Sequence, residues 1–408
     1  MATSKRRKKK PQSNTGGFKR FVRELSGLLR ELNIDKSFEK TPVNFMRKMY
    51  AYKFHILNPE KGNNFITSHE IRYISERTKK YMHKKVIVYS DIIVSPYDLI
   101  LLKCFSQILP ELIKREEQGK NREEPELSNE IAPELNDAFI RLFSINFYNM
   151  IARLNSPDRK IYGANYRILD PIKEKPRLEI KTVVYGFPPR KTIIAIDGMK
   201  RPVFQLAKPV YDAPVEWVTI NTGLLEDKYE GNHKTLEVYI QSHALRRLRE
   251  RLDLLSDHSI NYTLWENSAE IKEVICYKGY MLLPYKVFDT KVGYLVAYVI
   301  EEKFIIKTFL FITHTFTPEG DQLLKLTGLG RHDITYWKID RLSTFVNLDT
   351  EENKDIIELF NEAGLGELMN LKQKEFDIES LHAHNLKGLM QYITKNQAFS
   401  LSEEFAVV

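Results

Sequence analysis

The hydrophobic pattern changes near residue 155, and this change limits the folds that the 408-residue chain can adopt. Before that point, apolar residues such as Phe21, Leu25 and Leu28 recur at helical spacing. After it, short β-branched or aromatic runs alternate with turn residues such as Asp197-Gly198, a dipeptide that favours a type I′ hairpin turn. Helical material followed by a run of strands predicts an α+β fold.

Capping residues mark where several of the expected helices begin. Thr67 and Glu70 have the spacing of a capping box, and Pro96 suits the first turn of another helix. A further helix is expected over Pro133–Leu154, and a basic one over Ser242–Leu255. Strands are expected at residues 183–185, 192–196, 203–206, 215–220, 236–240, 280–287, 293–300 and 304–313.

Changes in composition divide the chain into parts of different character. The aromatic content of 22 Phe, 21 Tyr and 3 Trp supplies more burial than a disordered chain carries, so most of the protein is expected to fold. The expected parts are a disordered basic tail at 1–17, a helical domain at 18–155, a β-rich region at 156–232, an α+β unit at 233–345 and a helical C-terminal extension at 346–408.

Charge and cysteine content narrow the class of protein. The formal net charge of +8 and the isoelectric point of about 9.0 favour phosphates or acidic surfaces as partners. Cys104 and Cys276 are the only cysteines, which is too few for a disulfide framework or a cysteine zinc site. Charged residues interrupt every long apolar stretch, so no membrane partner is expected. The chain is expected to be a soluble cytoplasmic protein.

The tail carries the densest positive charge. Six adjacent cations precede Pro11 and a run rich in Ser and Gly, so the segment is expected to stay extended. Such a run suits a phosphate-binding arm, while the alternative is a tail that only improves solubility. The residues expected to contact phosphates there are Lys5, Arg6, Arg7, Lys8, Lys9 and Lys10.

The segment from Ser242 to Leu252 is the most informative for function. His243, Arg247 and Arg251 lie four residues apart, so on a helix they form one cationic ridge. The other side of this helix carries an apolar stripe that can anchor it on a sheet, made of Leu245, Leu248 and Leu252.

Neighbouring charges allow two interpretations of this ridge. Arg246 and Arg249 add positive charge that suits further phosphate contacts. Alternatively, the ridge arginines pair with carboxylates such as Glu250 and only stabilise the fold. If Arg247 and Arg251 face a phosphate at the surface, replacing either with alanine is expected to leave stability within about 0.5 kcal/mol of wild type.

The pattern His-Ala-x-x-Arg-x-x-Glu-Arg, which runs from His243 to Arg251, resembles the small bacterial domains found beside RelE- and BrnT-type toxins. The resemblance covers residues 236–315. The toxins are similar in layout, with helical material against an antiparallel sheet, and their characterised members are metal-independent endoribonucleases. The resemblance therefore implies this layout and this activity. This chain departs from the family in being much longer and in the extended stretch Asp253–Gly279 between the helix and the strands.

The resemblance implies a catalytic set of His243, Arg247, Arg251 and His314, because the closing strand of the family domain would bring residues 313–315 near the helix ridge. Cleavage without a metal needs a base, an acid and cations that hold the phosphate. The arginines suit phosphate binding, and either histidine suits the base or the acid. In this interpretation the protein needs no cofactor and no metal.

Three functions remain open at this level. The first is an RNA-directed, toxin-like endoribonuclease, with a small inhibitor protein among its partners. The second is a non-catalytic protein that binds nucleic acid, RNA or the ribosome through the same surface. The third is a structural or assembly protein whose basic helices bind acidic partners. The sequence contains no Gly-rich phosphate loop, no His-Glu-x-x-His and no Gly-x-Ser-x-Gly, which excludes the commonest nucleotide-driven, zinc and serine enzymes.

Overall fold

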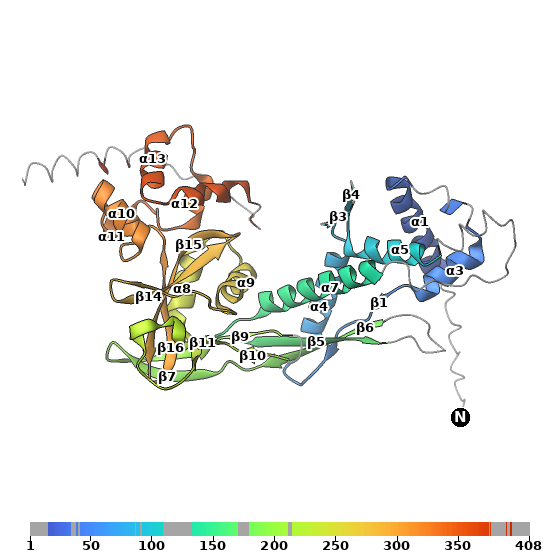
Figure 1. Ribbon diagram of the computed structural model, residues 1–408, viewed down its shortest axis with the longest axis horizontal. Coiled ribbons are helices and arrows are strands. Elements are labelled where there is room, and N and C mark those ends of the chain that lie inside the picture. Colours follow the sequence, from blue (N-terminus) through green and yellow to red (C-terminus); the bar gives the residue numbers. More distant parts are fainter. Residues whose placement is uncertain are drawn as a thin grey trace, which may run out of the picture. The chain divides into compact units, whose positions relative to one another are not determined.

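The chain forms an α+β protein with two compact units, as expected for the fold class (Figure 1). The first unit contains residues 1–150 and 165–184, and the second contains 151–164 and 185–408. This computed structural model describes residues 15–33, 38–39, 41–85, 87–89, 92–108, 133–169, 179–210, 214–374, 376, 389 and 392–393. The basic tail Lys5–Lys10 and most of the chain after 374 therefore lie outside the described residues.

Helices dominate the described part of the first unit. They are α1 (Thr15–Glu31), α3 (Val43–Tyr52), α4 (Ser68–Met82), α5 (Pro96–Ser106) and α7 (Pro133–Leu154). Short strands that the sequence did not predict accompany them, namely β1 (His55–Ile56), β2 (Glu60–Lys61), β3 (Ile87–Tyr89) and β4 (Ile92–Val94). Strand β6 (Glu179–Phe187) pairs with β1, β2 and β5 (Ile161–Leu169).

Side-chain caps begin two of these helices where the sequence predicted. The Thr67 hydroxyl accepts a hydrogen bond from the Glu70 amide at 3.2 Å, and the Glu70 carboxylate accepts one from the Thr67 amide at 2.7 Å. Ser95 and Asp98 form the same reciprocal cap before α5, with Pro96 in its first turn. Both caps satisfy amides that the first turn of a helix leaves without partners.

One large sheet organises the second unit, and in the described chain it has eight strands. Their order is β13-β14-β15-β16-β12-β8-β7, and β11 also pairs with β12. The bounds are β7 (Lys191–Ile196), β8 (Met199–Gln205), β11 (Thr219–Asn221), β12 (Thr235–Gln241), β13 (Ile275–Tyr277), β14 (Tyr280–Val287), β15 (Thr290–Ile300) and β16 (Lys303–Phe311). A separate pair is β9 (Ala207–Lys208) with β10 (Glu216–Trp217).

The sheet groups the chain differently from the parts expected at 156–232, 233–345 and 346–408. Strand β8 pairs with β12, so strands of the first two ranges share one sheet. A single hydrophobic core extends from Phe204 to Ile393 and includes residues of all three ranges. Hydrogen bonds between strands distant in sequence cause this regrouping, and they cannot be read from local composition.

The hairpin between β7 and β8 has the predicted turn. Asp197 and Gly198 have φ angles of 51° and 73°. Positive φ at both central residues defines a type I′ turn, in which glycine carries no steric penalty.

Helices surround the sheet of the second unit. They are α8 (Ser242–Arg251), α9 (Asp257–Ser268), α10 (Pro318–Thr327), α11 (Arg331–Tyr336), α12 (Leu342–Asn347) and α13 (Lys354–Glu362), with 3₁₀ turns at Thr222–Leu224, Glu226–Lys228 and Gly366–Gln373. The predicted basic helix is therefore shorter than expected, and α9 was not predicted. Ser256 begins α9 by accepting a hydrogen bond from the Ser259 amide at 3.3 Å. No helix among the described residues combines the length and apolar character needed to cross a membrane.

Helix α8 takes the place of a strand beside the second half of β16. Strand β12 pairs in parallel with β16 only from Glu237–Ile240 against Lys303–Ile306, and α8 begins directly after β12. From there α8 contacts β16 more than any other element.

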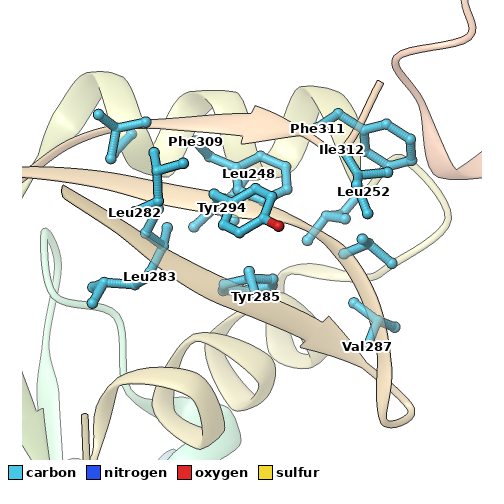
Figure 2. Packing of buried hydrophobic residues seen from close by; sticks show 14 of the residues in the cluster. Leu248, Leu252, Leu282, Leu283, Tyr285, Val287, Tyr294, Phe309, Phe311 and Ile312 are labelled. Carbon is cyan, nitrogen blue, oxygen red and sulfur yellow. The ribbon is translucent and has the colours of Figure 1, made fainter. Parts of the chain in front are cut away.

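The apolar stripe of α8 lies in the core, as predicted. Leu248 and Leu252 are fully buried. Figure 2 shows them among side chains of the sheet, including Tyr294 of β15 and Phe309 and Phe311 of β16. Burying this stripe fixes the rotation of α8 about its axis and so determines where the polar side of the helix lies.

Candidate functional site

A pocket of about 390 Å³ in the second unit is lined by side chains of α8, the sheet and the loop after β16. It brings together the four residues proposed from the sequence as a catalytic set, His243, Arg247, Arg251 and His314. Its volume falls in the range of small-molecule and cofactor sites.

Three further cations, which the sequence interpretation did not include, line the pocket. They are Arg201 from β8, Lys307 from β16 and Arg331 at the start of α11. Lys307 pairs with Asp197, the only carboxylate residue in the described lining, at 2.6 Å. Within the described chain, Arg201 and Arg331 form no ion pair with a carboxylate, so their charge is available to an anion. These three residues lie far apart in the sequence, so no sequence motif links them.

The contact that His243 makes defines its tautomer. Its Nδ1 lies 3.0 Å from a guanidinium nitrogen of Arg246. Because guanidinium only donates hydrogen bonds, Nδ1 must accept, and the proton of the neutral ring resides on Nε2. Burial lowers the pKa of His243 below its ordinary value, and the positive charges of Arg247 and Arg246 lower it further. His243 is therefore neutral near pH 7 and has an N–H to donate.

His314 has the opposite tautomer. Its Nδ1 is hydrogen-bonded to the backbone carbonyl of Thr315. A carbonyl only accepts, so Nδ1 carries the proton and Nε2 has the free electron pair. Burial lowers the pKa of His314; the bond to Thr315 opposes this, while the charge of Arg331 adds to it. His314 is therefore neutral near pH 7 with a basic Nε2.

The loop that carries His314 is anchored from both sides. The buried hydroxyl of Thr313 donates to the carbonyl of Ile339 at 2.7 Å. Thr317 is also buried; its hydroxyl contacts the carbonyls of Ile312 and His314 at 2.7 and 2.8 Å and accepts from the Gly320 amide. These contacts fix the loop as a rigid support for the imidazole, which is what a positioned base requires.

Gly320 is required by the close approach of this loop to α10. A Cβ atom built at Gly320 would lie 2.0 Å from the carbonyl oxygen of His314 and 2.7 Å from the Thr317 hydroxyl. No side chain fits at that distance without displacement of backbone. Glycine at this position therefore allows α10 to hold the His314 loop.

Phe316 in the same loop is both exposed and strained. Its φ is 76°, a region that bulky residues rarely occupy and that costs about 1–3 kcal/mol. Its side chain is 43% exposed and lines the pocket. Burial of the ring therefore does not account for the strain.

The two ridge arginines are paired with carboxylates, as the alternative interpretation allowed. Arg247 donates to Glu250 at 2.6 Å and is half-buried. Arg251 is largely buried and pairs with Asp340, whose side chain is only 1% exposed. Arg251 is therefore not the exposed surface residue that the phosphate-binding interpretation assumed. The cause is a partner far along the chain that sequence spacing on α8 does not reveal.

The remaining helix arginines lie in different environments. Arg246 is 64% exposed and bonds to His243, so it supports the pocket from outside its lining. Arg249 lies on another side of the helix, within 3.4 Å of Asp257 and 3.8 Å of Asp158. Its position favours a structural role over the expected phosphate contact.

Metal-binding side chains do not gather in the described lining of the pocket. The one described group with suitable spacing for a metal is Glu226, Asp227 and Cys276, which are exposed and lie outside the pocket lining. The chemistry available in the pocket is that of imidazoles, guanidinium groups, aromatic rings and the Lys307–Asp197 ion pair.

Comparisons with protein-family models, with curated proteins and with solved structures find no match for this chain. The function must therefore be inferred from the geometry of the pocket.

The Arg251–Asp340 pair generates a prediction about stability. Replacing Arg251 with alanine leaves a buried carboxylate without its main partner, so the free energy of unfolding is expected to fall by about 3–5 kcal/mol. Urea denaturation measures this loss. The double variant Arg251→Met, Asp340→Leu removes both charges and is expected to recover most of the lost stability. Wild-type stability of Arg251→Ala would contradict a buried pair.

Gly320→Ala is expected to disturb His314 specifically. The added methyl forces the loop carbonyl away, which lowers stability by about 1–3 kcal/mol and shifts the NMR signals of the His314 ring. Gly27→Ala is the matched control, because Gly27 lies in α1 and a Cβ there would meet only open space. Alanine at this position is expected to raise the free energy of unfolding by about 0.5–1 kcal/mol. If Gly320→Ala leaves both stability and the His314 signals unchanged, α10 does not position the histidine.

Proposed function

We propose that this protein acts on RNA in the pocket between α8 and the loop after β16, and that it cleaves the chain without a metal. The observation that carries the proposal is the pair of opposite histidine tautomers in one cationic pocket. One imidazole offers a basic nitrogen and the other an N–H donor. Beside them lie Arg201 and Arg331, which form no ion pair with a carboxylate within the described chain. The likeness of the α8 motif to RelE- and BrnT-type domains supports the same function.

The histidine roles follow from their hydrogen bonds. Nε2 of His314 takes the proton of a 2′-hydroxyl, and the 2′-oxygen attacks the adjacent phosphorus. The bond from phosphorus to the 5′-oxygen breaks, water protonates the departing oxygen, and a 2′,3′-cyclic phosphate remains. Nε2–H of His243 donates to a phosphate oxygen, since a neutral imidazole with its proton on Nε2 is a hydrogen-bond donor there.

The cations supply the electrostatic part of the proposed reaction. The charge on the phosphate oxygens increases as the 2′-oxygen attacks, and guanidinium groups stabilise that charge through paired N–H donors. Arg331 is the best placed for this role, because its charge acts on the base His314 and no described carboxylate neutralises it. Arg201, whose charge acts on His243, suits a neighbouring phosphate. Arg247 can contribute through donors that Glu250 leaves free.

A second candidate function is phosphate binding without cleavage. The charges that lower the pKa of His243 include Arg201, Arg246 and Arg247, whereas those that lower the pKa of His314 are Arg331 and Arg251. The span from His243 to Arg251 along α8 is roughly 12 Å. The histidines therefore lie near opposite ends of the ridge, which favours contacts to successive phosphates over joint action on one.

Cleavage in the absence of divalent metal tests the first candidate. The enzyme is expected to cut RNA, to leave 2′,3′-cyclic phosphate ends and to spare DNA of the same sequence, which lacks the attacking hydroxyl. The base is neutral His314, whose pKa lies below its ordinary value of 6.5. Activity should therefore fall only when the pH drops below about 6.5. No loss is expected on the alkaline side near neutrality, since neutral His243 only donates.

His314→Ala should lower the cleavage rate by about 10²–10⁴-fold, the usual contribution of a general base. His332→Ala is the matched control, because His332 is exposed and does not line the pocket. RNA that is bound but stays intact would favour the second candidate. Full activity in His314→Ala would show that the proposed base is wrong.

A further inference from the structure

Three aromatic side chains form a continuous wall of the pocket. Tyr280 of β14 contacts Tyr298 of β15 edge to face, with ring centroids 6.1 Å apart. Tyr280 also contacts Phe316 of the loop after β16, with centroids 5.7 Å apart. All three residues line the pocket that holds the histidines.

This wall differs from the aromatic core beneath it. Phe309 and Phe311 also border the pocket, but they are fully buried and pack against α8, the sheet and the C-terminal helices. Tyr280 and Tyr298 are only half-buried, and Phe316 is exposed in a strained backbone conformation. An exposed ring that is held at the edge of a pocket by an unfavourable backbone conformation indicates a ligand-binding surface.

A bulge in the sheet places a cation beside the same wall. The pairing of β15 with β16 passes from Val296–Thr308 to Ala297–Ile306, so Lys307 faces no residue of β15. Its ammonium lies 5.1 Å from the centroid of the Tyr298 ring and pairs with Asp197. Bulges redirect side chains in this way next to functional sites.

We propose that Tyr280, Tyr298 and Phe316 form a nucleobase subsite, in which a base stacks on the aromatic wall while its phosphate meets the pocket arginines. The inference rests on the proposed function and names its substrate as single-stranded RNA. A base can stack on protein rings only when it is free of its neighbours in a duplex. The wall and the arginines border one pocket, so both parts of a nucleotide are recognised together.

Binding of an RNA that cannot be cleaved tests the subsite. The probe is a short single-stranded oligonucleotide with 2′-O-methyl riboses, and its partner probe lacks the bases but keeps every phosphate. Phe316→Ala is expected to weaken binding of the intact probe by about 5- to 150-fold, as the loss of one base stack does. It should leave binding of the abasic probe unchanged, and Phe316→Trp should retain wild-type affinity.

Phe288→Ala is the matched control. Phe288 has a similar exposure of 44% and a positive φ of 49°, but it does not line the pocket. This variant should bind both probes as wild type does. If Phe316→Ala lowers the affinity for both probes equally, or for neither, the subsite is wrong. RNA binding by the wild type would still support the proposed function in that case. A wild type that binds neither probe would overturn both.

Discussion

The second unit depends on the packing of α8 against β16. Strand β12 ends halfway along β16, and an amphipathic helix continues beside the half of β16 that β12 does not pair with. Leu245, Leu248 and Leu252 bury one side of the helix in the core. This burial directs His243 and Arg247 toward the pocket on the other side, so the position of the candidate site follows from the hydrophobic stripe.

Buried polar contacts then fix the pocket in place. The Arg251–Asp340 pair ties the end of α8 to the segment after α11, and Thr313 ties the His314 loop to Ile339 of that same segment. Thr313 and Asp340 are fully buried, so both contacts are costly to break from one side. The segment at 339–340 thus holds the helix ridge and the histidine loop in a fixed relation, although neither residue lines the pocket.

The sequence was informative where local chemistry determines structure. The capping box at Thr67, the turn at Asp197-Gly198 and strand β14 were predicted from residue type and spacing alone. Helical spacing also identified the ridge on α8. The burial of Arg251, the pairing of β8 with β12 and the cations Arg201 and Arg331 were missed, because each depends on contacts between distant segments. The strain at Phe316 was missed as well, since backbone angles imposed by a loop leave no pattern in residue type.

The salt dependence of RNA binding tests most directly the claim that this pocket holds a nucleic-acid phosphate. Affinity of single-stranded RNA is measured over a salt series for wild type, Arg331→Ala and Arg72→Ala, an exposed arginine outside the pocket. Arg331→Ala is expected to bind RNA more weakly, with a slope of log affinity against log salt that is smaller by about 0.7, whereas Arg72→Ala should bind as wild type does. An unchanged slope and affinity in Arg331→Ala would contradict that claim.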